Sequence, residues 1–66
     1  MHNYEVRLFD KSGTLALSML IAANCDDDAL LPIRNFNSDK FAIVEIWRDM
    51  DLIYVGPVRS SQPQAA

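Results

Sequence analysis

The sequence predicts an α+β domain, in which two hairpins form a four-stranded antiparallel sheet and one short, proline-kinked helix packs on one face. Apolar residues recur at every second position in the first part of the chain, and a run of aromatic and β-branched residues fills the last third. Between them lies one segment that opens with a cluster of aspartates, as helices often do. The expected order is strand, strand, helix, strand, strand.

The first hairpin is predicted from alternation on both sides of a turn. Residues 4–9 place large apolar side chains on one side, and residues 10–13 (Asp-Lys-Ser-Gly) are typical of a turn. Residues 14–23 are rich in Ala, Leu and Met, which favour helices, but their large apolar residues are spaced by two. A strand is predicted here, because a four-residue turn would set Leu8 opposite Leu15 and gather these side chains on one face.

The helix is expected to begin near Asp26, because residues 24–28 offer capping side chains and carboxylates that complement the helix dipole. The core-facing stripe would consist of Ala29, Leu30, Ile33 and Phe36. Pro32 lacks a backbone donor and clashes with the preceding turn, so a regular helix as far as Phe36 is not expected. Either a kink or two short pieces would result. Residues 35–39 should form a loop.

The second hairpin carries the strongest strand pattern. Residues 41–48 are rich in aromatic and β-branched side chains and contain neither glycine nor proline. Residues 48–51 should form the turn, and residues 52–55 should return as the fourth strand, ended by a Gly-Pro pair. Residues 59–66 lack any large apolar side chain and are predicted to be a disordered tail, which leaves residues 1–58 as a single domain.

Composition limits the function classes. The 66 residues carry a net charge of −3, and the basic residues are scattered singly, which argues against a nucleic-acid surface. One cysteine allows no internal disulfide, and one cysteine with one histidine cannot make a structural zinc site within one chain. The longest apolar stretch is too short to span a membrane and lacks a basic lead-in. A cytoplasmic location is therefore expected.

No motif predicts an enzyme, a cofactor or a metal site. Cys25 has only the near-terminal His2 as a partner base, and the neighbouring aspartates oppose formation of its thiolate. The three consecutive aspartates diverge around a helix and cannot all face one ion. The sequence contains no glycine-rich phosphate loop and no nucleophile elbow.

The sheet face opposite the helix is the candidate functional surface. With the second turn at residues 48–51, Trp47 would lie opposite Leu52 and Glu45 opposite Tyr54, and one face would carry a cluster of large apolar side chains. Its members would be Phe41, Ile43, Trp47, Leu52 and Tyr54. So much aromatic surface on a small domain predicts a partner, most simply a second copy of the chain in a homodimer. The alternatives are that these residues are assigned to the wrong face, or that the tail and the 35–39 loop cover this face within one monomer.

Two other functions use the same face. In the first, a regulatory domain would bind single-stranded nucleic acid by stacking bases on aromatic rings, with basic side chains on the phosphates. The stacking residues would be Trp47, Tyr54 and Phe41, and the basic ones Arg7, Lys40 and Arg48. In the second, a small molecule would bind in a groove between two copies, because one small sheet with one helix rarely encloses a large enough pocket.

Overall fold

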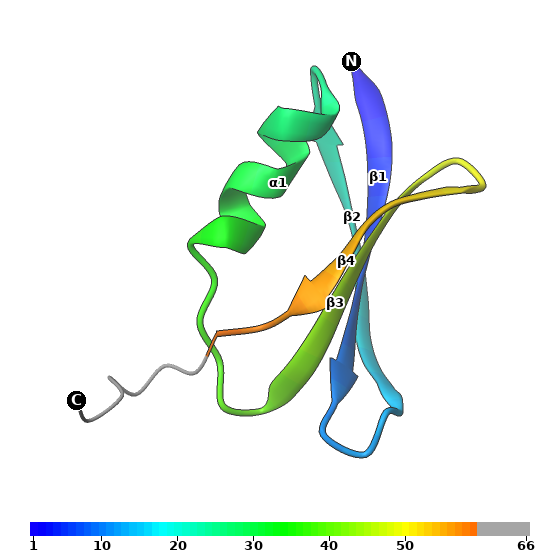
Figure 1. Ribbon diagram of the computed structural model, residues 1–66. Coiled ribbons are helices and arrows are strands. Elements are labelled where there is room, and N and C mark those ends of the chain that lie inside the picture. Colours follow the sequence, from blue (N-terminus) through cyan, green and yellow to red (C-terminus); the bar gives the residue numbers. More distant parts are fainter. Residues whose placement is uncertain (60–66) are drawn as a thin grey trace.

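In the computed structural model, which describes residues 1–59, four antiparallel strands form one open sheet and one helix lies against it (Figure 1). The elements are β1 (His2–Asp10), β2 (Leu15–Ala23), α1 (Asp26–Arg34), β3 (Phe41–Arg48) and β4 (Asp51–Pro57). The predicted α+β class and the β-β-α-β-β order are confirmed. β2 is a strand, so the period of two in its sequence outweighs the helix preference of its residues.

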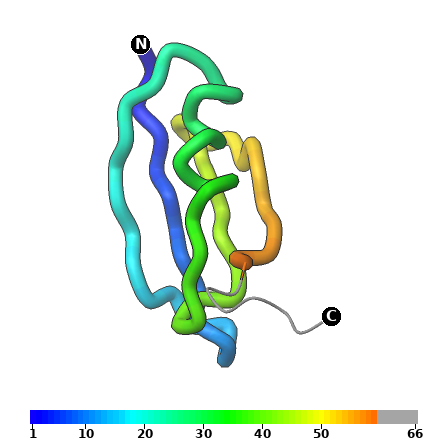
Figure 2. Tube along the Cα trace, turned by 90° about the vertical axis from the view of Figure 1, so that its left-hand side faces the viewer, coloured from blue at the N-terminus to red at the C-terminus, as the bar shows by residue number. Residues whose placement is uncertain are grey.

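The strand order across the sheet is β2-β1-β3-β4, and every neighbouring pair is antiparallel. Each hairpin contributes two adjacent strands, and β1 joins β3 in the middle (Figure 2). In the first hairpin, Leu8 lies opposite Leu17 and not opposite Leu15, so the predicted register is wrong by two residues. A shift of two keeps Leu17, Met19 and Ile21 on the predicted face, but the bulge at Ala16 turns Leu15 to the opposite face, where it was not expected.

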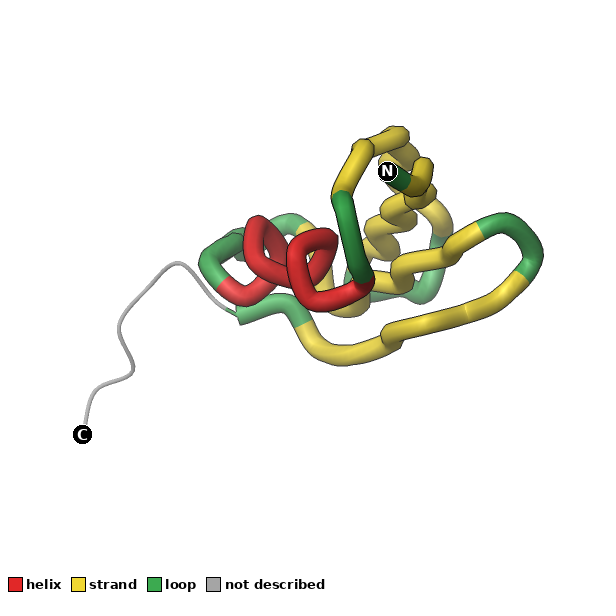
Figure 3. Tube along the Cα trace, turned by 90° about the horizontal axis from the view of Figure 1, so that it is seen from above, coloured by secondary structure: helices red, strands yellow, loops and turns green. Residues whose placement is uncertain are grey.

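The core lies between α1 and the central strands, with the helix on one side of the sheet (Figure 3). The buried side chains are Tyr4, Val6, Leu8, Ala23, Ala29, Val44 and Ile46. The partly buried side chains that pack against them are Ile21, Leu30, Ile33, Phe36, Phe41, Ile53, Tyr54 and Val58. The four residues predicted as the helix stripe therefore do face the core, although Phe36 lies in the loop after the end of the helix at Arg34.

The helix starts at Asp26 as predicted, but its N-cap is Cys25, which makes no side-chain capping hydrogen bond. The expected Asn or Asp cap is therefore wrong. Pro32 lies inside the helix, which runs as one element to Arg34, so the two-piece alternative is excluded. Pro32 cannot donate a backbone bond to the carbonyl four residues earlier, and only Ile33 and Arg34 of the helix follow it.

A tight turn joins the two strands of each hairpin. In the first, Gly13 has a φ of 87°, and one carboxylate oxygen of Asp10 accepts hydrogen bonds from Ser12 and from the backbone N–H of Thr14. These bonds, led by that of the Ser12 hydroxyl, lower the pKa of Asp10. In the second turn, Asp49 has a φ of 56°, a conformation that aspartate tolerates better than most residues.

The segment after the helix meets the end of the described chain. Asn37 forms an isolated parallel bridge with Arg59, and the backbone N–H of Ser38 donates to the Arg59 carbonyl at 2.8 Å. Arg59, assigned from sequence to a disordered tail, is therefore paired with this loop, and residues 60–66 lie outside the described residues. Within residues 1–59, α1 is too short to cross a bilayer.

Candidate functional site

The face of the sheet opposite α1 carries no other element of the described chain (Figures 1 and 3). Because alternate residues of a strand point to opposite faces, the strand registers place three rows of four residues there. From β2 to β4, the rows are Leu20, Glu5, Trp47 and Leu52; Ser18, Arg7, Glu45 and Val55; and Leu15, Phe9, Ile43 and Pro57. These residues are called the open face below.

Three of the five residues predicted for this surface lie on it. Ile43, Trp47 and Leu52 belong to the open face, and Trp47 is opposite Leu52 as predicted. Phe41 and Tyr54 do not, because both pack against the core on the helix side of the sheet. The structure therefore divides the predicted aromatic cluster between two faces.

A β-bulge explains each displaced aromatic residue. In β4 the pairing passes from Ile46 opposite Tyr54 to Trp47 opposite Leu52, so Ile53 is an extra residue and Tyr54 changes face. The sequence-based pairing of Tyr54 with Glu45 is wrong for this reason.

The second bulge lies where β3 meets β1. Phe41 pairs with Asp10, and Ala42 is the extra residue before Ile43. The Phe41 ring therefore turns to the helix side, where its centre lies 6.3 Å from that of Phe36. The clustering of Phe41 with Ile43 and Trp47 on one face is a wrong expectation.

A polar network crosses the middle of the open face. The Arg7 guanidinium donates from Nε to Glu5 Oε2 at 2.8 Å and from Nη2 to Glu5 Oε1 at 3.1 Å. The Ser18 hydroxyl donates to the same carboxylate at 3.3 Å. The hydrogen bond from Arg7 lowers the pKa of Glu5, and the bond to Glu5 raises the pKa of Arg7. The carboxylate is therefore held ionised beside the apolar rows.

Two contacts fix the orientation of the Trp47 side chain on the open face. Its indole Nε1 donates to Glu45 Oε1 at 2.9 Å, and the Arg7 guanidinium carbon lies 5.0 Å from the ring centre. This separation is within the range of a cation–π contact. The two contacts hold the ring against the sheet and leave it half-buried. Such a preoriented ring loses little conformational entropy when a partner binds.

The predicted interface residues all came from the second hairpin, although Arg7 and Phe9 of the first hairpin were expected to share this face. Leu15, Leu20 and Phe9 lie on the open face, and Val55 replaces Tyr54 there. The alternation in residues 4–23 identifies Phe9 and Leu20, which fall between the core-facing residues, but not Leu15, which only the bulge at Ala16 turns to this face. No residue type typical of a bulge stands at Ile53, so the sequence did not show that Val55 would lie on the open face.

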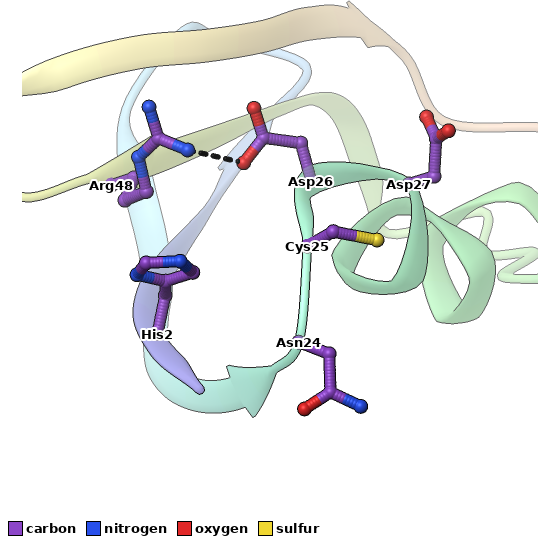
Figure 4. Close-up of a pocket in the computed structure, with 6 residues that line it drawn as sticks. All are labelled: His2, Asn24, Cys25, Asp26, Asp27 and Arg48. Carbon is purple, nitrogen blue, oxygen red and sulfur yellow. Dashed lines mark hydrogen bonds and ion pairs between the residues drawn. The ribbon is translucent and has the colours of Figure 1, made fainter.

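A second candidate site is a shallow hollow at the N-terminal end of α1 (Figure 4). Its volume is ≈ 330 Å³, and it is lined by His2, Asn24, Cys25, Asp26, Asp27 and Arg48. The Cys25 thiol points away from the His2 ring in Figure 4, so the two do not form a nucleophile and base pair. The arrangement offers no assembled acid and base chemistry.

The polar groups of this hollow fasten the helix to the sheet. Asp26 Oδ1 accepts a hydrogen bond from the buried Tyr4 hydroxyl and another from Arg48 Nη1, each at 2.8 Å. Burial, and then the hydrogen bond to Asp26, raises the pKa of Tyr4. The charge of Asp26 is the main cause of the raised pKa of Arg48. These residues have a structural role that the sequence-based reasoning did not assign to them.

Among residues 1–59 no three His, Cys, Asp or Glu side chains are grouped so that they could hold a metal ion. Comparison of the chain with protein-family models, curated proteins and solved structures gives no match. The inferences about function therefore rest on the open face and the strand edges.

Proposed function

We propose that this chain is a small, non-enzymatic interaction module that associates with a second copy of itself through the open face. One observation supports the proposal: large apolar side chains are exposed there and no described residue covers them. The open-face residues that are more than one third exposed include Leu15, Leu20, Ile43, Leu52 and Val55. These side chains lie in two apolar rows on either side of the polar network, and exposed apolar side chains gathered on one face often mark a contact site.

The size of the domain supports a partner of the same sequence. A chain of 66 residues buries a smaller fraction of its surface than a larger domain does, and Cys25 is free. Association is one of the few remaining ways to bury more apolar area. Two-fold homodimers are the commonest assembly of soluble proteins, so a second copy is the simplest occupant.

The open face is small for an interface. Four strands about 4.8 Å apart and three rows about 6.8 Å apart span roughly 400 Å² before side-chain relief is counted. Standard interfaces bury about 800 Å² on each partner. A dimer formed by this face alone should therefore be weak and should dissociate on dilution.

The polar groups of the open face are bonded mainly to one another. Arg7 is paired with Glu5 and stacked on Trp47, whose indole donor is taken up by Glu45. A face whose charges are satisfied internally suits contact with a similar apolar face better than it suits chemistry on a substrate. The free, exposed Cys25 is compatible with a reducing compartment, and we place the module in the cytoplasm on that ground.

The test is the mass in solution over a range of concentration, measured by light scattering on a sizing column. The wild type should exceed the mass of one chain at high concentration, and Leu52→Lys should lower the mass by placing a charge in the contact. Met50→Lys is the matched control, because Met50 is exposed in the β3–β4 loop, outside the open face. Equal masses for the wild type and Leu52→Lys would refute the proposal.

The nucleic-acid alternative loses most of its surface in the structure. Of the three proposed stacking rings only Trp47 is on the open face, and Arg48 lies on the helix side, bonded to Asp26. A gel shift with single-stranded RNA at low salt would revive this alternative if the shift disappeared on addition of salt.

A further inference from the structure

The edge of the sheet formed by β2 has no neighbour in the described chain (Figure 2). The strand is nine residues long, contains no charged residue and no proline, and has Ser18 as its one polar residue. Natural edge strands are usually short or carry lysine, proline or an inward-pointing charge, because a bare edge pairs with other strands. β2 has none of these protections.

The opposite edge, β4, is protected. Pro57 lacks a backbone N–H, the bulge at Ile53 interrupts the regular ladder, and Asp51 adds a charge at the start of the strand. The bulge in β2 lies near its beginning, at Ala16, and leaves residues 17–23 in regular pairing. The two edges therefore differ in their readiness to accept another strand.

The ladder shows which backbone groups of β2 point away from β1. The backbone N–H of Asp10 donates to the carbonyl of Thr14 on the β2 side. N–H groups alternate in direction along a strand, so the even-numbered residues of β1 bond to β2 and pair there with odd-numbered residues. On β2 the N–H and C=O groups of Ser18, Leu20 and Ala22 consequently point away from the sheet.

We propose that β2 pairs with β2 of a second copy of this chain, antiparallel and across a two-fold axis at Leu20. Ser18 then lies opposite Ala22 of the partner subunit, and Leu20 lies opposite the partner's Leu20. Each of these positions offers an outward-facing donor and acceptor, so the junction forms about six backbone hydrogen bonds. This proposal goes beyond the open-face association, because it concerns the edge of the sheet, and the two have separate readouts: amide exchange in β2 reports the edge, and the mass of Leu52→Lys reports the open face.

Side chains on both faces favour a second copy of the chain as the occupant. On the helix side, Leu17 and Met19 are 43% and 40% exposed, and on the open face Leu20 is 78% exposed. Self-pairing brings these side chains beside Ile21, Ala23 and Leu20 of the partner subunit, and so covers apolar surface on both faces.

Charge also favours self-pairing at this place. Each chain carries a net charge of −3, so two copies repel one another in most relative orientations. β2 contains no charged side chain, and an antiparallel pair centred on Leu20 sets no like charges opposite each other. The pairing is also isologous, as a two-fold dimer requires.

The first test is residue-resolved amide hydrogen exchange at low and at high protein concentration. The amides of Leu20 and Ala22 should exchange rapidly when dilute and at least about tenfold more slowly when concentrated, because their N–H groups become bonded. The amides of Met19 and Ile21 should be protected at both concentrations, since they already face β1. Unchanged exchange at Leu20 and Ala22 while the mass rises would overturn the edge pairing.

A pair of variants completes the test. Ser18→Pro removes one outward-facing donor at an edge position where proline is tolerated, and it should raise the dissociation constant of the dimer at least tenfold. Ser18→Ala removes only the hydroxyl and should leave the constant within about twofold. If Ser18→Pro does not fold, Leu20→Lys serves instead, because two lysines would meet at the axis. Retained concentration-dependent protection in the variant used would refute the proposal, whereas Leu52→Lys should leave that protection intact.

Discussion

Tyr54→Ala and Leu52→Ala should act on different properties, although the two residues are close neighbours in one strand. Tyr54 packs against the core. Its ring lies so close to Gly56 that a Cβ atom at position 56 would be only 2.9 Å from the ring carbon Cζ, so the ring is in close contact with that glycine. An aromatic side chain buries about 200 Å² when fully covered, and Tyr54 is mostly buried, so at about 25 cal/mol per Å² its removal should cost roughly 3–4 kcal/mol of stability. Leu52 is 45% exposed and should cost about 1 kcal/mol or less.

The assay is urea denaturation at a concentration low enough to keep the chain monomeric, combined with the mass at high concentration. Tyr54→Ala should lower the denaturation midpoint and leave self-association of the folded fraction nearly unchanged. Leu52→Ala should weaken association with a small effect on the midpoint. The reverse result, with a stable Tyr54→Ala that no longer associates, would refute the bulge at Ile53 and restore the sequence-based face assignment.

Two pH dependences and one turn give further tests. Burial is the main cause that raises the pKa of Tyr4 above its ordinary 10.0, so the folded state holds the proton more tightly than the unfolded state. The free energy of unfolding should therefore fall as the pH rises above 10.0. Tyr4→Phe should remove most of that fall in denaturation curves. The pKa of Asp10 is lowered below 3.8, so its contribution to stability is present above pH 3.8 and is lost as the pH falls through the lowered value. Asp10→Asn should therefore weaken the acid side of the dependence of stability on pH. An unchanged acid side would contradict the turn geometry. Asp49→Gly should stabilise the chain by about 0.5–1 kcal/mol in urea, because glycine adopts a positive φ without strain, and a loss of stability would argue against the φ of 56°.

The architecture could be predicted because its main signals are local. The alternation in β1 and β2 and the apolar run of residues 41–48 depend on neighbours a few positions away, and they define the strands and the faces. The β1–β2 register shows the limit of such signals. Apolar side chains recur at every second position, so any shift by two residues preserves the faces equally well. Only the geometry of the turn and the bulge at Ala16 selects Leu17 as the partner of Leu8.

The candidate surface was harder to predict because it depends on bulges and on distant contacts. Neither Ala42 nor Ile53 is a residue type that marks a bulge, yet each turns an aromatic neighbour to the helix side. The role of Asp26 was missed for a related reason. Its partners Tyr4 and Arg48 are each 22 residues away, and no local pattern connects them.

The two proposed associations reinforce each other geometrically. In any antiparallel pairing of β2 through its outward-facing groups, even-numbered residues meet even-numbered residues, so both helices lie on one side of a continuous sheet. The two open faces then form one surface of about 800 Å², which reaches the size of a standard interface, whereas a single open face does not.

In the order of assembly, edge pairing should therefore form a dimer first, and stacking of the open faces of two dimers should then form a tetramer. Leu52→Lys should stop this series at two chains, because it leaves the edge intact. Ser18→Pro should stop it near one chain, because separate open faces are too small to associate strongly. If Ser18→Pro instead formed stable dimers while Leu52→Lys stayed monomeric, the open face would be the stronger contact and the proposed order of assembly would be wrong.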